Sequence, residues 1–182
     1  MDKLDGSERK YIKRYFETMI APVLSPQVVD SHHPFPHLEG KVLYIAALLS
    51  HKKTERLGLI PVPASLPPLI FLPNDKRRCL MTEDIILAFA DDVFEMYDVL
   101  EKTVFCVTRN ADVPLDDEPF GSEQVDLRRK MEKMLRQRRR MGVVRVELSR
   151  PVSSHFKAYF RDRFEVTDAQ IFLSRNAPLR MG

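Results

Sequence analysis

The stretch LEKTVFCVTRNADV, residues 100–113, determines how the other elements of this chain are arranged. Apolar side chains occupy both alternating sets of positions across residues 104–107, so both faces of the segment are expected to be covered. Asn110 tolerates a left-handed backbone and Asp112 can accept hydrogen bonds from nearby amides, so a sharp turn is expected there. The pattern predicts a central strand that ends at Arg109.

Composition limits the classes of protein that this chain can belong to. Its 182 residues are 44% hydrophobic, which is enough to bury one core. A net charge of +3 with 30% charged residues requires neither nucleic acid nor a membrane as a partner. Cys79 and Cys106 lack CxxC spacing and favour neither a disulfide framework nor zinc. With no apolar run as long as a membrane span and no hydrophobic leader, a cytoplasmic protein is expected.

Hydrophobic spacing predicts further strands and helices along the chain. Besides the central strand, strands are expected at residues 42–49, 56–62, 69–72, 143–148 and 169–173. Helices are expected to begin at Ser7, Thr82, Ser122 and Pro151, and the first is expected to end at Pro22. Together these elements predict an α+β fold in a single domain, with a mixed, largely antiparallel sheet of about six strands and about four helices packed on it.

Motifs of several enzyme classes are missing from the sequence. The six glycines form no cradle for a phosphate, which excludes a phosphate loop or dinucleotide fingerprint. GxSxG and HExxH are absent as well. A metal site is one interpretation of the three histidines His32, His33 and His37. The prolines among them hold the backbone extended, and no carboxylate or thiolate follows at the spacing of a metal ligand. The sequence therefore favours a structural role, in which these histidines pack within the loop.

The segment SEQVDLRRKMEKMLRQRRRM, residues 122–141, predicts a helix with a basic face. Its candidate contacts to a polyanion are Arg128, Arg129, Arg136, Arg139 and Arg140. Such a row would release counterions from a phosphate polymer, and binding would weaken with salt. The alternative is a solvated helix whose last arginines lie at the negative end of its dipole, and the residues alone favour this alternative.

Arg109, Asn110 and Asp112 form a second candidate site at the end of the central strand. The guanidinium of Arg109 offers a planar fork for a phosphate, and its two polar neighbours would orient it. Alternatively, Asn110 and Asp112 shape the turn while Arg109 pairs with an acidic residue in the loop that follows. The residues leave both interpretations open.

Several stretches, taken in order, resemble one family. They are PVLSPQVVDSHHPFPHL at 22–38, VPASLPPLIFLP at 62–73, FCVTRNADV at 105–113, VVRVEL at 143–148 and AQIFLSRNAPL at 169–179. Each is similar to a stretch of the middle domain of polyphosphate kinases, and the resemblance covers residues 11–179. The chain is therefore identified as a member of this family.

The resemblance implies a function that the residues alone do not indicate. Polyphosphate kinases reversibly transfer the terminal phosphate of ATP to inorganic polyphosphate through a phosphohistidine, with magnesium, and imidazole suits this chemistry because it can accept and release a phosphoryl group. In the family, the catalytic histidine and the groups that bind ATP lie mainly in the C-terminal domains. None of the five histidines here matches that motif, so the segment alone is expected to be inactive and to hold no cofactor, catalytic residue or metal.

The resemblance also implies partners. Residues 1–182 look like the middle domain without the N-terminal helical domain and the C-terminal catalytic domains of the same enzyme, which are the expected partners. A second copy in a homodimer and polyphosphate itself are further expected partners. Nucleic acid is not expected, and peripheral membrane association of the parent enzyme is compatible with the resemblance. The alternative hypothesis is an autonomous module that binds nucleic acid or another polyanion through residues 122–141.

Departures from the family pattern limit what the resemblance can transfer. Pro68 and Cys106 stand where the family usually has arginines, so ligand contacts of those arginines do not carry over. Glu95 and Met96 replace a Pro-Gly turn before the central strand, and Ala177 stands where glycine is usual.

Overall fold

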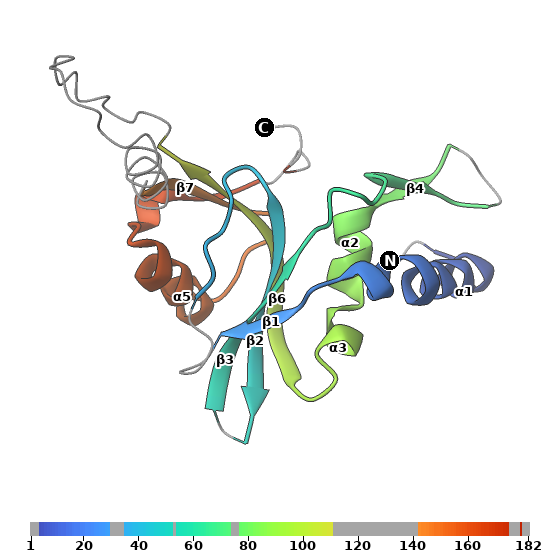
Figure 1. The fold of residues 1–182 in the computed structure, drawn as a ribbon, viewed down its shortest axis with the longest axis horizontal. Coiled ribbons are helices and arrows are strands. Elements are labelled where there is room, and N and C mark those ends of the chain that lie inside the picture. Colours follow the sequence, from blue (N-terminus) through green and yellow to red (C-terminus); the bar gives the residue numbers. More distant parts are fainter. Residues whose placement is uncertain are drawn as a thin grey trace, which may run out of the picture.

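A mixed β-sheet forms the middle layer of the computed structural model (Figure 1). Within the described residues it has six strands in the order β1-β3-β2-β6-β7-β8. The strands are β1 (Gln27–Val29), β2 (Leu43–His51), β3 (Thr54–Pro61), β6 (Asp98–Arg109), β7 (Val143–Leu148) and β8 (Ile171–Leu173). β7 and β8 are parallel and the other neighbours are antiparallel. The predicted α+β fold with a mixed, largely antiparallel sheet is confirmed.

Some of the predictions fall on residues whose structure is not described. The structure describes residues 4–29, 35–52, 54–73, 77–110, 142–174 and 179. The predictions for His32, His33, Asp112 and the basic helix at 122–141 lie outside these residues and stay predictions.

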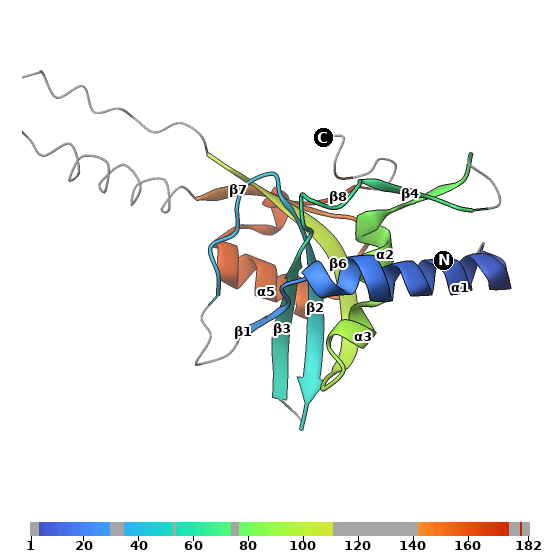
Figure 2. The same cartoon turned by 45° about the vertical axis from the view of Figure 1, so that its right-hand side comes forward.

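Helices cover both faces of the sheet (Figures 1 and 2). The α-helices within the described residues are α1 (Gly6–Tyr15), α2 (Thr82–Ala88), α3 (Ala90–Val93) and α5 (Ser154–Phe164). The first three lie on one face and α5 lies on the other. No helix in the described segments combines the length and the apolar character needed to cross a membrane.

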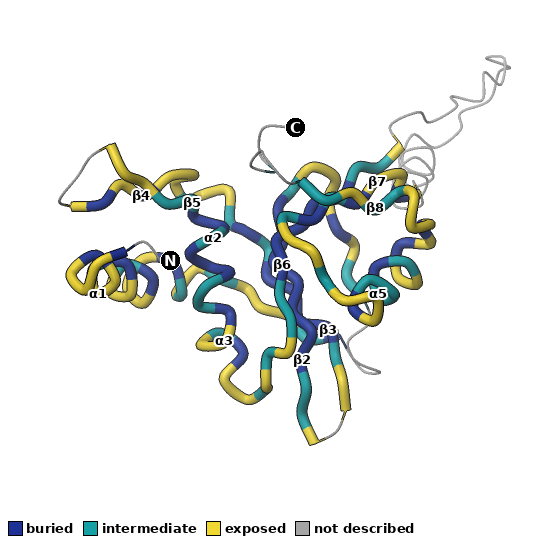
Figure 3. The backbone as a smooth tube through the Cα atoms, turned by 180° about the vertical axis from the view of Figure 1, so that it is seen from behind, coloured by how far each residue is buried: buried dark blue, intermediate teal, exposed yellow. Residues whose placement is uncertain are grey.

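β6 is the central strand, as predicted, because its side chains enter two different cores. Val104 and Cys106 pack beneath α1 and α2, whereas Phe105 and Val107 pack beneath α5. All four are buried, and the strand lies between the two layers in Figure 3. The continuous apolar pattern in the sequence therefore corresponds to a strand covered on both faces.

Three short strands differ from the prediction. The segment expected at 69–72 forms β4 (Leu69–Phe71), but it pairs with β5 (Cys79–Met81) in a separate two-stranded ribbon and does not join the main sheet. β1 and β5 were not predicted. Each has three residues, too few for a period-2 pattern to show, so pairing with a neighbouring strand defines them.

The first helix begins earlier than predicted. Ser7 was expected to cap it, but Asp5 is the cap, and a carboxylate oxygen of Asp5 accepts a hydrogen bond from the Glu8 N–H at 2.8 Å. The Glu8 carboxylate in turn accepts the Asp5 N–H at 3.0 Å, which completes a capping box. The α-helix gives way to a π-helical turn at Phe16–Ile20 and then to a 3-10 turn at Ala21–Val23, so the helical segment ends within one residue of the predicted Pro22.

Of the other two helix starts within the described residues, the one expected at Pro151 shifts and the one at Thr82 is confirmed. The helix expected to open at Pro151 begins at Ser154, because the Ser153 hydroxyl accepts the Phe156 N–H at 3.0 Å and acts as the cap. α2 begins at Thr82, as predicted, and Met81 is its cap. The Thr82 hydroxyl donates to the Pro67 carbonyl and so ties the helix to the segment before β4.

Candidate polyanion site at the end of the central strand

Arg109 is the last residue of β6, which confirms its predicted place at a strand end. The pairing of β6 with β7 shifts register between Thr108 and Arg109, so the strand is bulged at this point. Asn110 follows, and its backbone N–H donates to the Gly142 carbonyl at 3.2 Å, just before β7 begins. The structure therefore places Arg109 and Asn110 side by side at one end of the sheet.

A role of Arg109 that sequence reasoning missed is to fasten the segment at residues 35–42. Its Nε donates to the Leu38 carbonyl at 2.9 Å. The Lys41 N–H donates to the Val107 carbonyl at 2.8 Å, so the same segment is bonded to β6 two residues earlier. A Cβ atom on Gly40 would lie 3.9 Å from the Arg109 Cβ, which shows how closely the two segments approach. This bond fixes the Arg109 side chain in one orientation.

The environment of Arg109 is partly shielded from water. Burial lowers the pKa of Arg109 below its ordinary value, and the nearby Tyr44 phenol acts in the opposite direction. Because that ordinary value is so high, the guanidinium stays charged at neutral pH. A charge in partly desolvated surroundings attracts an anion more strongly than a fully solvated charge does. The arrangement can therefore contribute to anion binding.

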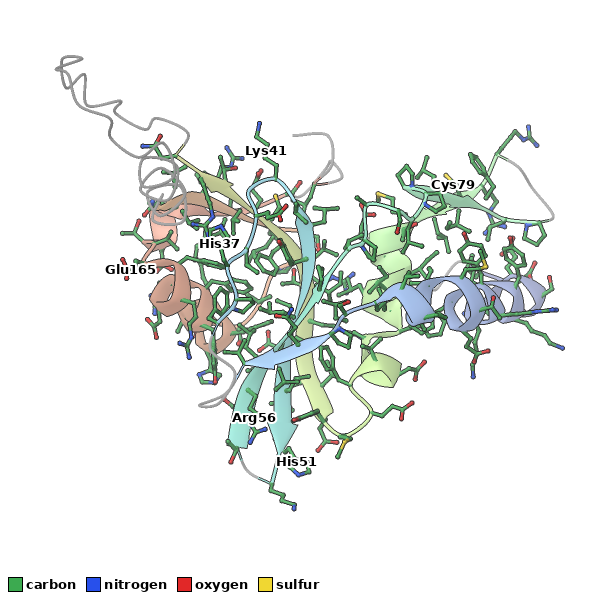
Figure 4. All side chains as sticks on the ribbon, viewed as in Figure 1. His37, Lys41, His51, Arg56, Cys79 and Glu165 are labelled. Atoms are coloured by element: carbon green, nitrogen blue, oxygen red, sulfur yellow. The ribbon has the colours of Figure 1, made fainter. Side chains whose placement is uncertain are left out.

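Lys41 adds a second positive charge to this end of the sheet. It is exposed and has a positive φ of 63°, in the left-handed region. Figure 4 shows its side chain extending outward from the segment that crosses β6. Sequence reasoning did not single out Lys41, because only its contact with Val107 brings it to the end of β6.

The structure does not describe most of the other predicted site residues. Asp112, Arg128, Arg129, Arg136, Arg139 and Arg140 lie outside the described residues. His37 lies on the segment at 35–42, and within the described part of the chain no group of three potential metal ligands is found. The candidate site is therefore built from Arg109, Asn110 and Lys41.

The side chain of Cys106 lies on the face of β6 that packs beneath α1 and α2, whereas that of Val107 lies on the face beneath α5. Its thiol donates to a carboxylate oxygen of Glu147 at 3.7 Å, and Glu147 also accepts a hydrogen bond from Arg145 at 2.8 Å. The Arg145 guanidinium lies 4.4 Å from the centre of the Phe172 ring. Burial, and then the Glu147 charge, raise the pKa of the Cys106 thiol to about 11.

This environment predicts that the two free thiols differ in reactivity. At pH 8, with a pKa of about 11, roughly one Cys106 thiol in a thousand is ionised, and the side chain is buried. Cys79 is exposed on β5 (Figure 4). Treatment of the folded chain with iodoacetamide is expected to modify Cys79 alone, and both thiols after unfolding in urea, as measured by mass spectrometry. Equal labelling of both in the folded chain would contradict this.

Comparisons with known proteins agree with the resemblance. The family model described as "Polyphosphate kinase middle domain" matches residues 7–182. A polyphosphate kinase of Exiguobacterium sibiricum is 34% identical over 177 residues, which are 94% of this chain and 24% of that protein. One of Bacillus anthracis is 34% identical over 179 residues, 93% of this chain and 25% of that protein.

A solved structure shares the fold. The polyphosphate kinase from Porphyromonas gingivalis superposes with a TM-score of 0.69 over 97% of this chain and 25% of that one, at 21% identity. The fold and the matches define the class, an α+β domain of a kinase. The chain belongs to the polyphosphate kinase middle-domain family. It spans about a quarter of the length of the curated relatives that it matches.

Proposed function

We propose that this chain acts as the middle domain of an enzyme that reversibly transfers the terminal phosphate of ATP to inorganic polyphosphate through a phosphohistidine. The observation that carries the proposal is the family match over residues 7–182, which takes in the whole sheet and all of its helices except the first residue of α1. The relatives are about four times as long as the matched region, which supports a role as one domain of a larger kinase.

Within that enzyme the proposed role of this domain is to hold other parts in place and to contact polyphosphate. The phosphorylated histidine and the groups that bind ATP and magnesium would belong to the other domains, which are its proposed partners together with a second copy of the chain. The parent enzyme would act in the cytoplasm. The isolated domain would then show no phosphate transfer from ATP.

The proposed contact to polyphosphate is the end of β6. Arg109 is held by the Leu38 carbonyl, so little side-chain freedom would be lost when its guanidinium meets a phosphate. Lys41 lies on the same bonded segment and adds a second charge. In the sequence, Arg109 and Asn110 precede residues 111–141, which contain the predicted arginine row.

A titration with long-chain polyphosphate tests this proposal. The chain is expected to bind polyphosphate in preference to single-stranded DNA, and more weakly at higher salt. Arg109→Gln removes one charge, so the affinity should fall several-fold and the slope of log K against log salt should decrease by about 0.7 to 0.9. Arg145→Gln is the matched control, because it removes one arginine charge from the opposite face of the sheet.

Three outcomes would count against the proposal. Absence of polyphosphate binding by the unmodified chain would remove the contact role and leave an architectural one. Equal affinity for single-stranded DNA would favour the alternative, a general polyanion-binding module. Synthesis of polyphosphate from ATP by the chain alone would overturn the assignment of the catalytic groups to other domains.

A further inference from the structure

α1 carries a basic face that the sequence analysis did not identify. Its four cationic residues are Arg9, Lys10, Lys13 and Arg14, and all four are exposed. At 3.6 residues per turn they lie within an arc of about 140° on one side of the helix. α1 projects beyond the sheet on the side opposite α5 (Figures 1 and 2), so this face is distant from the core beneath α5.

The opposite side of α1 is anchored, so the basic face keeps its direction. Ile12 is completely buried in the core that α1 shares with α2. Glu8 is also buried, and its carboxylate bonds to Arg78 at 2.5 Å, next to β5. The same Glu8 closes the capping box with Asp5. These contacts prevent the helix from rotating its charges toward the protein.

Among the residues that the structure describes, neighbouring acids neutralise little of this charge. Glu8 is occupied by Arg78, and Asp5 accepts hydrogen bonds at the start of the helix. Glu17 lies 3.9 Å from Lys13, and both side chains are more than half exposed, so this ion pair contributes little. The face therefore keeps a surplus of positive charge, and an anionic partner would be attracted to it.

We infer that the basic face of α1, formed by Arg9, Lys10, Lys13 and Arg14, binds a linear phosphate polymer. The cations recur one helical turn apart, about 5.4 Å along the axis, so an extended chain with one charge per phosphate can meet several of them at once. Each neutralised phosphate would release counterions, which favours binding to a polymer over binding to a single phosphate. The inference rests on the proposed function, and the polymer it specifies is polyphosphate.

The aromatic residues of α1 favour polyphosphate over single-stranded nucleic acid. Proteins that bind single strands combine positive charge with exposed aromatic rings on which bases stack. Tyr11 and Tyr15 are half-buried and pack against the core, with their ring centroids 6.2 Å apart. The basic face thus offers charge without a stacking platform. This is the chemistry that a polymer of phosphates alone requires.

The test is a triple variant of α1, Lys10→Gln/Lys13→Gln/Arg14→Gln, which leaves the Arg9 bond to the Leu4 carbonyl intact. The control variant Lys52→Gln/Arg150→Gln/Arg163→Gln removes three exposed charges elsewhere. Polyphosphate binding by the α1 variant is expected to weaken about tenfold or more, and the salt slope to fall by about 2. The control is expected to change less than about twofold. Thermal unfolding should show that both variants remain folded.

Two results would overturn the inference. If the α1 variant binds polyphosphate as the unmodified chain does, α1 is not a binding surface, although the proposed function stands if Arg109→Gln still weakens binding. The second result is that single-stranded DNA binds as tightly as polyphosphate and that the α1 variant loses affinity for both polymers equally. The basic face of α1 would then bind polyanions in general. Loss of binding in the control as large as in the α1 variant would also overturn it, because net charge alone would then explain the effect.

Discussion

Replacing Phe105 by alanine is expected to lower the free energy of unfolding by about 3–5 kcal/mol. Phe105 is completely buried in the core beneath α5. Its ring centroid lies 5.2 Å from that of Phe160, 6.1 Å from that of Phe164 and 5.7 Å from that of Tyr44. Alanine would leave a cavity among three rings that belong to α5 and β2, and those elements cannot close around it without moving the helix.

Urea unfolding followed by circular dichroism measures this effect. The matched control is Phe172→Ala on β8, where the side chain is 43% exposed and its ring lies beneath Arg145. Removing it should cost less than about 1 kcal/mol, because little apolar surface is returned to water and the contact with Arg145 is exposed. Similar losses in the two variants would contradict the view that Phe105 joins α5 to the sheet.

The central strand could be predicted because its pattern is local. Residues 104–107 are apolar on both alternating sets, and the structure buries Val104 and Cys106 on one side and Phe105 and Val107 on the other. A strand that is buried on both faces needs apolar side chains at successive positions, so such a strand can be predicted from the sequence. The predictions for strands at 42–49, 56–62 and 143–148 were confirmed within two residues at each end for the same reason.

The short elements depend on partners that are distant in the sequence. Val28 in β1 pairs with Gly58, and Leu80 in β5 pairs with Ile70, but three-residue strands carry no period of their own. Asp5 rather than Ser7 caps α1 because Glu8 completes the capping box from the third helical position. That choice could have been predicted, because aspartate followed three residues later by glutamate is a known helix-start pattern.

The candidate site was only partly predictable. The turn chemistry after Arg109 placed that residue at a strand end, as found. Its bond to the Leu38 carbonyl joins residues far apart in sequence, and no local pattern indicates such a contact. Lys41 enters the site for the same reason, through the bond of its N–H to Val107. The α1 basic face, in contrast, is visible in the sequence as cations at positions 9, 10, 13 and 14.

Gly58→Ala is expected to destabilise the chain by about 1–3 kcal/mol, although alanine is normally the better strand residue. A Cβ atom at this position would lie 2.7 Å from Cζ of Phe94 and 2.8 Å from Cδ1 of Leu49. Both of these side chains are buried, at 4% and 0% exposure, so neither can turn into solvent. In the described residues no glycine has a positive φ, so the expected cost is steric and not conformational.

A double-mutant cycle separates this clash from any general effect of the substitution. Phe94→Leu shortens the side chain that the new methyl group would meet, so Gly58→Ala should cost markedly less in the Phe94→Leu background than in the original chain. Gly6→Ala is the control, because nothing lies within 4 Å of its Cβ position, and it should leave stability unchanged or raise it slightly. If Gly58→Ala costs the same in both backgrounds, Phe94 is not the obstacle. The close approach of β3 to the turn after α3 would then not be what requires glycine at this position.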